Sequence, residues 1–173
     1  MATTGSSFER ALDELGVSVT HVDRAEFRDE IENAVDAPAV GVPLAETFGD
    51  AAFSLAETSV EVDPTPTALR DATTGVTGAQ LGIADYGTLV LALTEQASEL
   101  VSLFVERHVA VVRASGIVSE MDAAIEELDE EFSETRGSAI LATGPSATAD
   151  MGTLVKGAHG PREVHVVLVE EDE

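Results

Sequence analysis

Hydrophobic residues along this 173-residue chain recur with two spacings, one helical and one extended. Apolar positions three and four apart, as at Phe8, Leu12 and Leu15, predict amphipathic helices. Continuous apolar runs, such as Val-Ala-Val-Val at 109–112, are typical of strands buried on both faces. Helices are predicted at 8–15, 24–35, 67–72, 95–106, 119–132 and 147–156, and strands at 17–21, 39–42, 88–93, 109–112, 139–143 and 164–169. Because strands alternate with helices, we expect an α/β layered domain with a mostly parallel sheet.

Glycine, proline and capping residues mark the boundaries of these elements. Gly16 ends the first helix, and the Asp-Pro-Thr-Pro run at 63–66 is a break. The extended stretch 75–83 and the strand at 88–93 predict one antiparallel hairpin about a turn at 85–87. Ser119, followed three residues later by Asp122, resembles a capping box. Residues 51–55 fit a strand or a helical turn, and no linker divides the chain, so a single domain over residues 1–173 is expected.

The last third of the chain carries the strongest functional signal. It is predicted as strand, polar loop, helix, second polar loop and strand, with the loops at 143–146 and 157–161. Loops at the ends of buried parallel strands are where α/β proteins bind ligands, and free backbone N–H groups at a helix start hold phosphates or carboxylates. The predicted ligand-binding residues of the first loop are Thr143, Gly144, Pro145 and Ser146. An ordinary helix cap formed by Ser146 is the alternative.

Lys156 and His159 follow in the same region. Lys156 is the only lysine in the chain, so its compact positive charge is a candidate contact for an anionic small molecule. Pairing with the last carbonyl groups of its own predicted helix is an equal alternative. His159 lies in the Gly-Ala-His-Gly-Pro loop, where an imidazole can carry protons, or can simply face solvent. Gly160, beside it, is assigned to ligand binding.

The turn in residues 82–91 is a second candidate. A carboxylate at a glycine-flanked turn, here Asp85, can act as a general base, and Gly87 and Thr88 are assigned to ligand binding beside it. The alternative is a plain hairpin turn, which favours Asp and Gly for conformational reasons.

A metal site is the weakest of the candidates. His108, His159 and His165 are predicted near strand ends, where they can meet in space with Asp85 or Asp150 as a fourth ligand. Their spacing matches no local metal signature, so no metal is expected.

The net charge of the chain narrows the classes of molecule that it can bind. The chain has 33 Asp and Glu against 9 Lys and Arg, a net charge of −24, and the acids are dispersed among 44% hydrophobic residues. This composition suits a folded protein in concentrated salt, which screens self-repulsion, and we expect a halophilic, haloarchaeal source. An acidic surface made for a basic partner is the alternative. The negative field opposes binding to nucleic acid or to anionic membranes.

Missing residue types and segments exclude further classes. The chain has no cysteine, which excludes disulfides, thiolate zinc sites and a cysteine-held iron–sulfur cluster within it. No apolar run approaches the ~20 residues that span a membrane, and the first residues lack the pattern of a signal peptide. A cytoplasmic protein is therefore expected.

Several motifs, in order along the chain, resemble the LUD-domain family. They are Gly-Ile-Ala-Asp-Tyr-Gly-Thr-Leu-Val-Leu at 82–91, Ser-Leu at 102–103 with His-Val-Ala-Val-Val at 108–112, Thr-Gly-Pro-Ser-Ala-Thr-Ala-Asp-Met at 143–151, Gly-Ala-His-Gly-Pro at 157–161 and the strand at 164–169. Each motif is weak alone, whereas the ordered set is specific and is most similar to the lactate utilization C type. The motifs lie within residues 76–173, and residues 1–75 match only in general plan.

The resemblance implies a fold and a pathway. The fold would be a three-layer α/β domain similar to the ribose-phosphate isomerase and CoA-transferase group. The role would be to support oxidation of L-lactate to pyruvate beside iron–sulfur partner proteins, with no cofactor bound by this chain and the clusters held only by the partners. The family more often has Glu-Thr where this chain has Asp85 and Tyr86. The family has no settled catalytic residues, so the resemblance assigns none to this chain.

These observations predict a site in the cleft between the loops 143–146 and 157–160 and the turn 82–88, with His159 as the proton carrier and Lys156 attracting an anion. Two other functions remain open at this stage. One is a free-standing small-molecule enzyme or binding module for a phosphorylated or CoA-linked ligand, by fold analogy. The other is a scaffold or regulatory module without a ligand.

Overall fold

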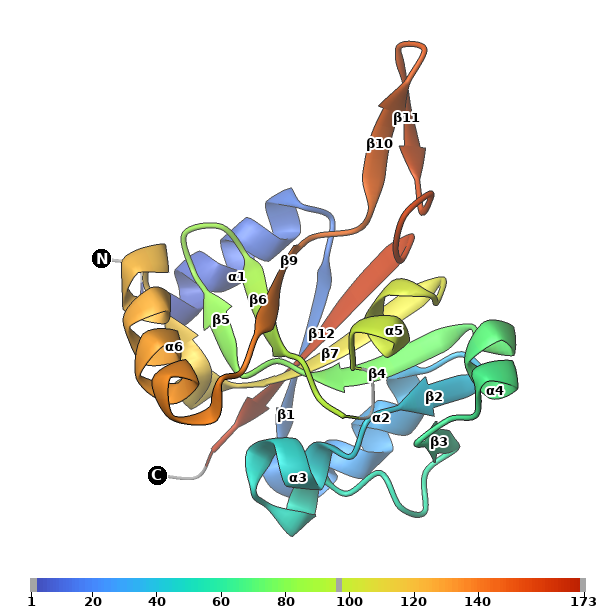
Figure 1. The fold of residues 1–173 in the computed structure, drawn as a ribbon, viewed down its shortest axis with the longest axis horizontal. Coiled ribbons are helices and arrows are strands. Elements are labelled where there is room, and N and C mark those ends of the chain that lie inside the picture. Colours follow the sequence, from blue (N-terminus) through green and yellow to red (C-terminus); the bar gives the residue numbers. More distant parts are fainter. Residues whose placement is uncertain (1–2, 96–97, 172–173) are drawn as a thin grey trace.

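A six-stranded parallel sheet forms the middle layer of the protein (Figure 1). The computed structural model describes residues 3–95 and 98–171. In spatial order, the strands are β1 (Ser18–Asp23), β12 (Glu163–Glu170), β7 (Arg107–Arg113), β4 (Thr74–Gly78), β2 (Ala39–Gly41) and β3 (Val60–Val62). Each neighbouring pair is parallel. The apolar runs form β7 and β12, two interior strands that are covered on both faces.

A smaller mixed sheet packs on one side of the first. Its order is β8 (Ile117–Val118), β5 (Leu81–Ile83), β6 (Thr88–Ala92) and β9 (Ala139–Thr143). The β5–β6 pair is antiparallel, which confirms the predicted hairpin. The predicted extended stretch 75–83 divides between β4 in the large sheet and β5 in the small one, so it links the two sheets.

Helices complete the layers. One face of β7 presents Val109 and Val111 to the apolar cluster that includes α2 (Phe27–Ala34). The other face presents Ala110 and Val112 to a cluster that includes α1 (Thr4–Glu14) and the small sheet. The remaining helices are α3 (Leu44–Phe48), α4 (Pro66–Asp71), α5 (Ser98–Leu103) and α6 (Met121–Thr135), with single 3₁₀ turns at η1 (Arg24–Glu26), η2 (Ala51–Phe53) and η3 (Ala114–Gly116). The predicted three-layer α/β fold with a mostly parallel sheet is confirmed.

The predicted helix at 147–156 is wrong. Residues 147–156 form an antiparallel hairpin, β10 (Ala147–Asp150) and β11 (Thr153–Lys156), which projects from the body of the protein (Figure 1). Met151 and Gly152 form its tip with φ of 49° and 80°, as a two-residue hairpin turn requires. Threonine and valine favour the extended conformation, and an internal glycine costs a helix about 1 kcal/mol.

Two other helix predictions change in detail. The capping box is wrong because α6 begins at Met121 after Glu120, and no side chain caps it. The helix predicted at 95–106 is described as the shorter α5, and residues 96–97 of that prediction lie outside the described residues. Within the described part of the chain, no helix is long and apolar enough to cross a membrane.

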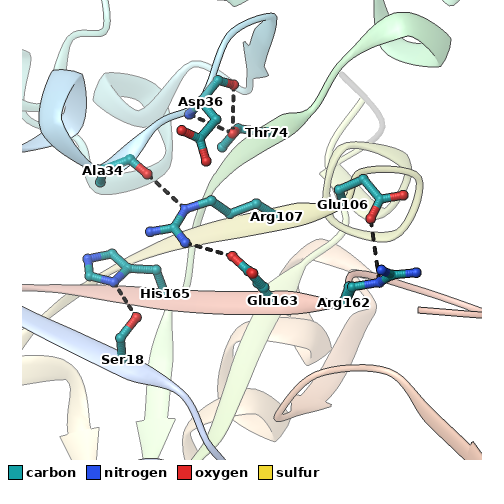
Figure 2. A network of polar contacts seen from close by, with 9 residues as sticks. All are labelled: Ser18, Ala34, Asp36, Thr74, Glu106, Arg107, Arg162, Glu163 and His165. Atoms are coloured by element: carbon teal, nitrogen blue, oxygen red, sulfur yellow. Dashed lines mark hydrogen bonds and ion pairs between the residues drawn. The ribbon is translucent and has the colours of Figure 1, made fainter. Parts of the chain in front are cut away.

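Polar contacts tie the amino ends of the central strands together (Figure 2). Arg107 at the start of β7 donates from Nε to the carbonyl oxygen of Ala34 at 2.9 Å, and from Nη1 to Glu163 Oε2 at 3.0 Å. The Thr74 hydroxyl donates to the carbonyl oxygen of Asp36 at 2.8 Å. These contacts fix the position of α2 relative to β4, β7 and β12 at this edge of the sheet.

Candidate functional site

A cavity of about 390 Å³ lies at the amino edge of the large sheet, beside the small sheet. Its walls come from α5, β6 and β9, and from the loops that precede β10 and β12. Apolar side chains dominate the lining and include Leu89, Leu91, Ile140, Pro161 and Val164. A mainly apolar cavity with a few polar groups is typical of a small-molecule site.

The two loops predicted from the sequence meet at this cavity. The Ser146 N–H donates to the carbonyl oxygen of Pro161 at 2.9 Å, and the Gly157 N–H donates to the carbonyl oxygen of Ser146 at 3.0 Å. The backbone nitrogen of His159 lies 3.3 Å from Ser146 Oγ. The backbone and the side chain of Ser146 therefore both hold the second loop in place. A Cβ on Gly160 would lie 3.1 Å from the Cβ of Ser146, which explains glycine at this close approach.

Most of the predicted binding residues line the cavity. They are Thr143, Gly144, Pro145, Ser146 and Gly160, with the predicted proton carrier His159 beside them. Thr88 lies at the same end, because its hydroxyl is 2.8 Å from that of Thr143 across the β6–β9 pair.

Three predicted site residues lie elsewhere. Lys156 is exposed on the hairpin opposite Ala147 and is not among the lining residues. Asp85 borders a separate cavity of about 370 Å³ beside α1, with Arg10 as a neighbour. Gly87 packs against α1, where an added Cβ would lie 3.1 Å from the backbone of Ala11.

The cavity also contains polar residues that the sequence did not single out as ligand contacts. His108 lies on β7 with 2% of its surface exposed, and its Nε2 is 2.7 Å from Thr77 Oγ1. Burial lowers the pKa of His108 to about 4, so its ring is neutral near pH 7. Ser102 of α5 is buried and donates to the carbonyl oxygen of Glu99 at 2.9 Å. Both residues lie in the sequence motif at 102–112, which is the feature of the sequence that could have pointed to them.

Permanently charged side chains are missing from the described lining of the cavity. The described residues that line it include no lysine, arginine, aspartate or glutamate. The nearest arginines on this sheet edge are already paired: Arg107 with Glu163 at 3.0 Å, and Arg162 with Glu106 at 3.7 Å (Figure 2). Because residues 147–156 form a hairpin, the loop 143–146 does not lead into a helix start at the cavity. The predicted anion site formed by helical N–H groups is therefore wrong in its structural basis.

His108 and His159 both line the cavity, but His165 does not join them. His165 points to the opposite face of the sheet from His108, where its Nδ1 and Nε2 lie 2.7 Å and 3.1 Å from the hydroxyls of Ser18 and Thr20. Burial, and to a lesser extent the positive charge of Arg107, lowers the pKa of His165. Across residues 3–95 and 98–171, no three His, Asp or Glu side chains come close enough to hold a metal ion.

Comparison with known proteins gives a consistent family. The family model for the LUD domain matches residues 3–169. Lactate utilization protein C from Deinococcus radiodurans is 30% identical over 165 residues, which cover 94% of this chain and 77% of that protein. The protein of the same name from Bacillus velezensis is 35% identical over 106 residues, 59% of this chain and 44% of the relative.

Two further similarities define the extent of the match. An uncharacterized protein from Neisseria meningitidis, NMB1437, is 37% identical over 57% of this chain and 42% of its own length. The matched region thus spans less than half of the Neisseria and Bacillus relatives. A crystal structure of a DUF162 family protein from Deinococcus radiodurans superimposes with a TM-score of 0.72 at 25% identity, covering 98% of this chain and 99% of that one.

Proposed function

This chain belongs to the LUD domain family, and from that premise we propose that it is a lactate utilization C-like subunit that supports oxidation of L-lactate to pyruvate. The observation that carries the proposal is its similarity over 94% of its length to the lactate utilization protein C of Deinococcus radiodurans. The family model matches residues 3–169, and all the residues that line the cavity described above lie within that range.

The proposal divides the chemistry between this chain and its partners. Oxidation of lactate to pyruvate removes two electrons and two protons from the substrate. Iron–sulfur clusters are held by cysteine thiolates, and this chain contains no cysteine. We therefore assign the clusters to iron–sulfur partner proteins and assign ligand binding and proton handling to this subunit.

The cavity is the proposed ligand site. Its first loop contributes Thr143, Gly144, Pro145 and Ser146, and Gly160 closes the second. His159 is the proposed proton carrier because it lines the cavity, is exposed to solvent and is held through its backbone by Ser146 Oγ. An imidazole in that position can exchange protons between the cavity and water.

Deletion of the encoding gene tests the pathway. The expected result is loss of growth on L-lactate as the sole carbon source with normal growth on pyruvate, because only the oxidation step is removed. Growth curves of the deletion strain and of a complemented strain measure this directly. Normal growth on lactate, in a strain with no second copy of the gene, would refute the pathway assignment.

Complementation with two variants tests the site. His159→Ala is expected to restore growth on lactate poorly because it removes the proposed proton carrier. His21→Ala, which removes an exposed histidine of β1 away from both the cavity and the projecting hairpin, is the matched control and is expected to restore growth fully. Thermal unfolding of both purified variants in high salt checks that they fold. Full rescue by His159→Ala would remove the proton-carrier role and leave the pathway assignment intact.

The projecting hairpin is the surface that we assign to the partner proteins. Met151, Leu154 and Val155 are 98%, 64% and 40% exposed. Among residues 138–161 only Asp150 and Lys156 are charged, although the chain as a whole carries −24. Low charge together with exposed apolar side chains is typical of the core of a protein–protein interface. An isolated two-stranded hairpin is also only marginally stable in water.

Leu154→Asp is expected to abolish co-purification with the iron–sulfur partners in high salt and to leave the melting temperature unchanged. The reason is that Leu154 contributes to an exposed surface rather than to the core. Ile125→Asp, an equivalent change at a half-exposed position on α6, is the control and should retain the partners. Equal retention of the partners by both variants would locate the interface away from the hairpin.

A further inference from the structure

The hydrogen bond between Thr77 and His108 fixes which nitrogen of the imidazole carries the proton. Thr77 is completely buried, and the only hydrogen-bond partner of its hydroxyl among the described residues is Nε2 of His108, at 2.7 Å. If Nε2 carried the proton, the Thr77 hydroxyl would have no acceptor, and an unsatisfied buried donor costs about 1–3 kcal/mol. The Thr77 hydroxyl therefore donates to Nε2, and the proton of the neutral ring is on Nδ1.

The protonated Nδ1 is a free donor beside the cavity. Within residues 3–95 and 98–171 no hydrogen bond is made by this nitrogen, although His108 is 98% buried and its ring lines the cavity. Nδ1 is not among the described buried polar atoms that lack a partner, so it retains accessible surface, and this donor is available to a ligand in the cavity that supplies an acceptor. The remaining surroundings, such as Leu89, Leu91 and Val164, offer apolar contacts.

We propose that the cavity binds an uncharged carbonyl group on an apolar body, with His108 donating from Nδ1 to the carbonyl oxygen. This inference rests on the proposed location of the ligand site but does not depend on the pathway. It replaces the anionic molecule expected from the sequence with an uncharged ligand at this position.

The lack of a permanent positive charge disfavours a carboxylate at this position. The described lining residues include no lysine or arginine, and Arg107 and Arg162 are paired with Glu163 and Glu106. Burial keeps the pKa of His108 at about 4, so the ring supplies no charge near neutral pH. Moving a carboxylate from water into an apolar site without an opposite charge is strongly unfavourable, and the net charge of −24 adds to the penalty.

Two sources supply this chemistry. One is a quinone ring, and the other is the acyl end of a thioester, whose charged carrier would stay in solvent. The cavity volume of about 390 Å³ accommodates a bicyclic ring or a short acyl chain. The adjoining cavity of about 450 Å³, which shares Leu103, His159 and Gly160 with the first, leaves room for a longer substituent.

The tautomer is tested first, on the free protein. Two-bond ¹H–¹⁵N correlation spectra distinguish protonated from unprotonated imidazole nitrogens. The expected spectrum of His108 at pH 7 has the proton on Nδ1, and Thr77→Val is expected to raise the population of the Nε2-protonated form. A wild-type ring protonated on Nε2 would overturn the inference without any ligand.

The ligand class is tested with probes of matched shape, by calorimetry in high salt. Menadione is the quinone probe, S-butanoyl-N-acetylcysteamine is the uncharged thioester probe, and 2-naphthoate is a bicyclic carboxylate. We expect binding of menadione, of the thioester or of both, which identifies the source, and no binding of 2-naphthoate. Binding of 2-naphthoate as tight as that of either neutral probe, or no binding of either neutral probe, would overturn the proposal.

Two substitutions of His108 separate its hydrogen bond from its packing. His108→Asn keeps an N–H donor near the position of Nδ1, whereas His108→Gln keeps a polar group near Thr77 and loses that donor. The Gln variant is expected to bind the neutral probe about tenfold more weakly than wild type, and the Asn variant to lie between them. Equal affinities of the wild type and the Gln variant would show that Nδ1 makes no bond to the probe. Loss of growth on lactate after gene deletion is a separate result, so the ligand class and the pathway can fail independently.

Discussion

Gly75→Ala is expected to lower the free energy of unfolding by at least about 3 kcal/mol, with a melting temperature lower by roughly 10 °C. Gly75 lies in β4 beneath α5, and an added Cβ would be 2.0 Å from the carbonyl oxygen of Val101 and 3.0 Å from its carbonyl carbon. Real Cβ atoms do not approach this closely, and the obstacle is backbone, so no side-chain rotation relieves it. Either α5 moves away from the sheet or β4 leaves its register with β7.

Gly5→Ala is the matched control for this change. Gly5 lies in the first turn of α1, and nothing lies within 4 Å of an added Cβ. Alanine there is expected to be neutral, or to stabilise by up to about 1 kcal/mol, through its higher helix propensity. Chemical denaturation of both variants and of the wild type gives the comparison. A Gly75→Ala protein as stable as the Gly5→Ala protein would mean that α5 does not pack on β4 as described.

The same contact connects stability to the candidate site. Ser102 and Leu103 reach the cavity from α5, and the close approach of α5 to Gly75 sets their height above the sheet. His108 is the register partner of Gly75 on the neighbouring strand. A glycine on β4 therefore helps to determine the shape of a cavity that it does not line.

The central strands could be predicted because their signal is local. The strands β7 and β12 are continuous apolar runs, which only burial on both faces explains, and α1 and α2 have apolar residues on one face. Their order in the sheet could not be derived from periodicity. It depends on pairings between distant segments, such as Ser18 of β1 with His165 of β12.

The hairpin at 147–156 was missed because its residues have weak local preference. Ala147, Ala149 and Lys156 fit a helix as well as a strand, and the short polar loop before them resembles a helix cap. The deciding residues are Met151 and Gly152, whose positive φ angles form the turn. Gly152, which disfavours a helix in the middle of this segment, is the one local signal of the turn.

The sequence predicted only part of the candidate site, because only part of the site has a local signal. The loops that contain Ser146 and His159 carry visible turn residues, so their place at strand ends could be expected. His108 looked like the first residue of a buried strand, and only the tertiary structure places its ring at a cavity wall. The unusual status of Lys156 as a lone lysine is visible in the sequence, but its position relative to the cavity follows from the hairpin.

Acidification from pH 7 to pH 5 is expected to cost the wild-type protein about 2 kcal/mol of stability through His108 alone. Burial lowers the pKa of this histidine from 6.5 to about 4 in the folded state, so between these values the unfolded chain binds the proton and the folded chain does not. The contribution is fully present above pH 6.5 and is lost as the pH falls toward 4. The free energy of unfolding, measured with denaturant in high salt at pH 7, 6 and 5, should therefore fall with pH.

His108→Asn is expected to flatten that fall, because the amide does not titrate. Part of the slope should remain, because the pKa of His165 is also lowered. His21→Asn is a control of opposite sign: Glu170 and Glu9 raise the pKa of the exposed His21 through hydrogen bonds, so its contribution is present at low pH and is lost as the pH rises. Removing His21 should make the protein slightly more sensitive to acid. A His108→Asn protein that loses as much stability as the wild type between pH 7 and pH 5 would mean that the pKa of this imidazole is the same in the folded and unfolded states. The ring would then become positively charged as the pH falls toward 5 and could pair with a carboxylate there, so the same titration that measures stability also tests the electrostatic character of the site.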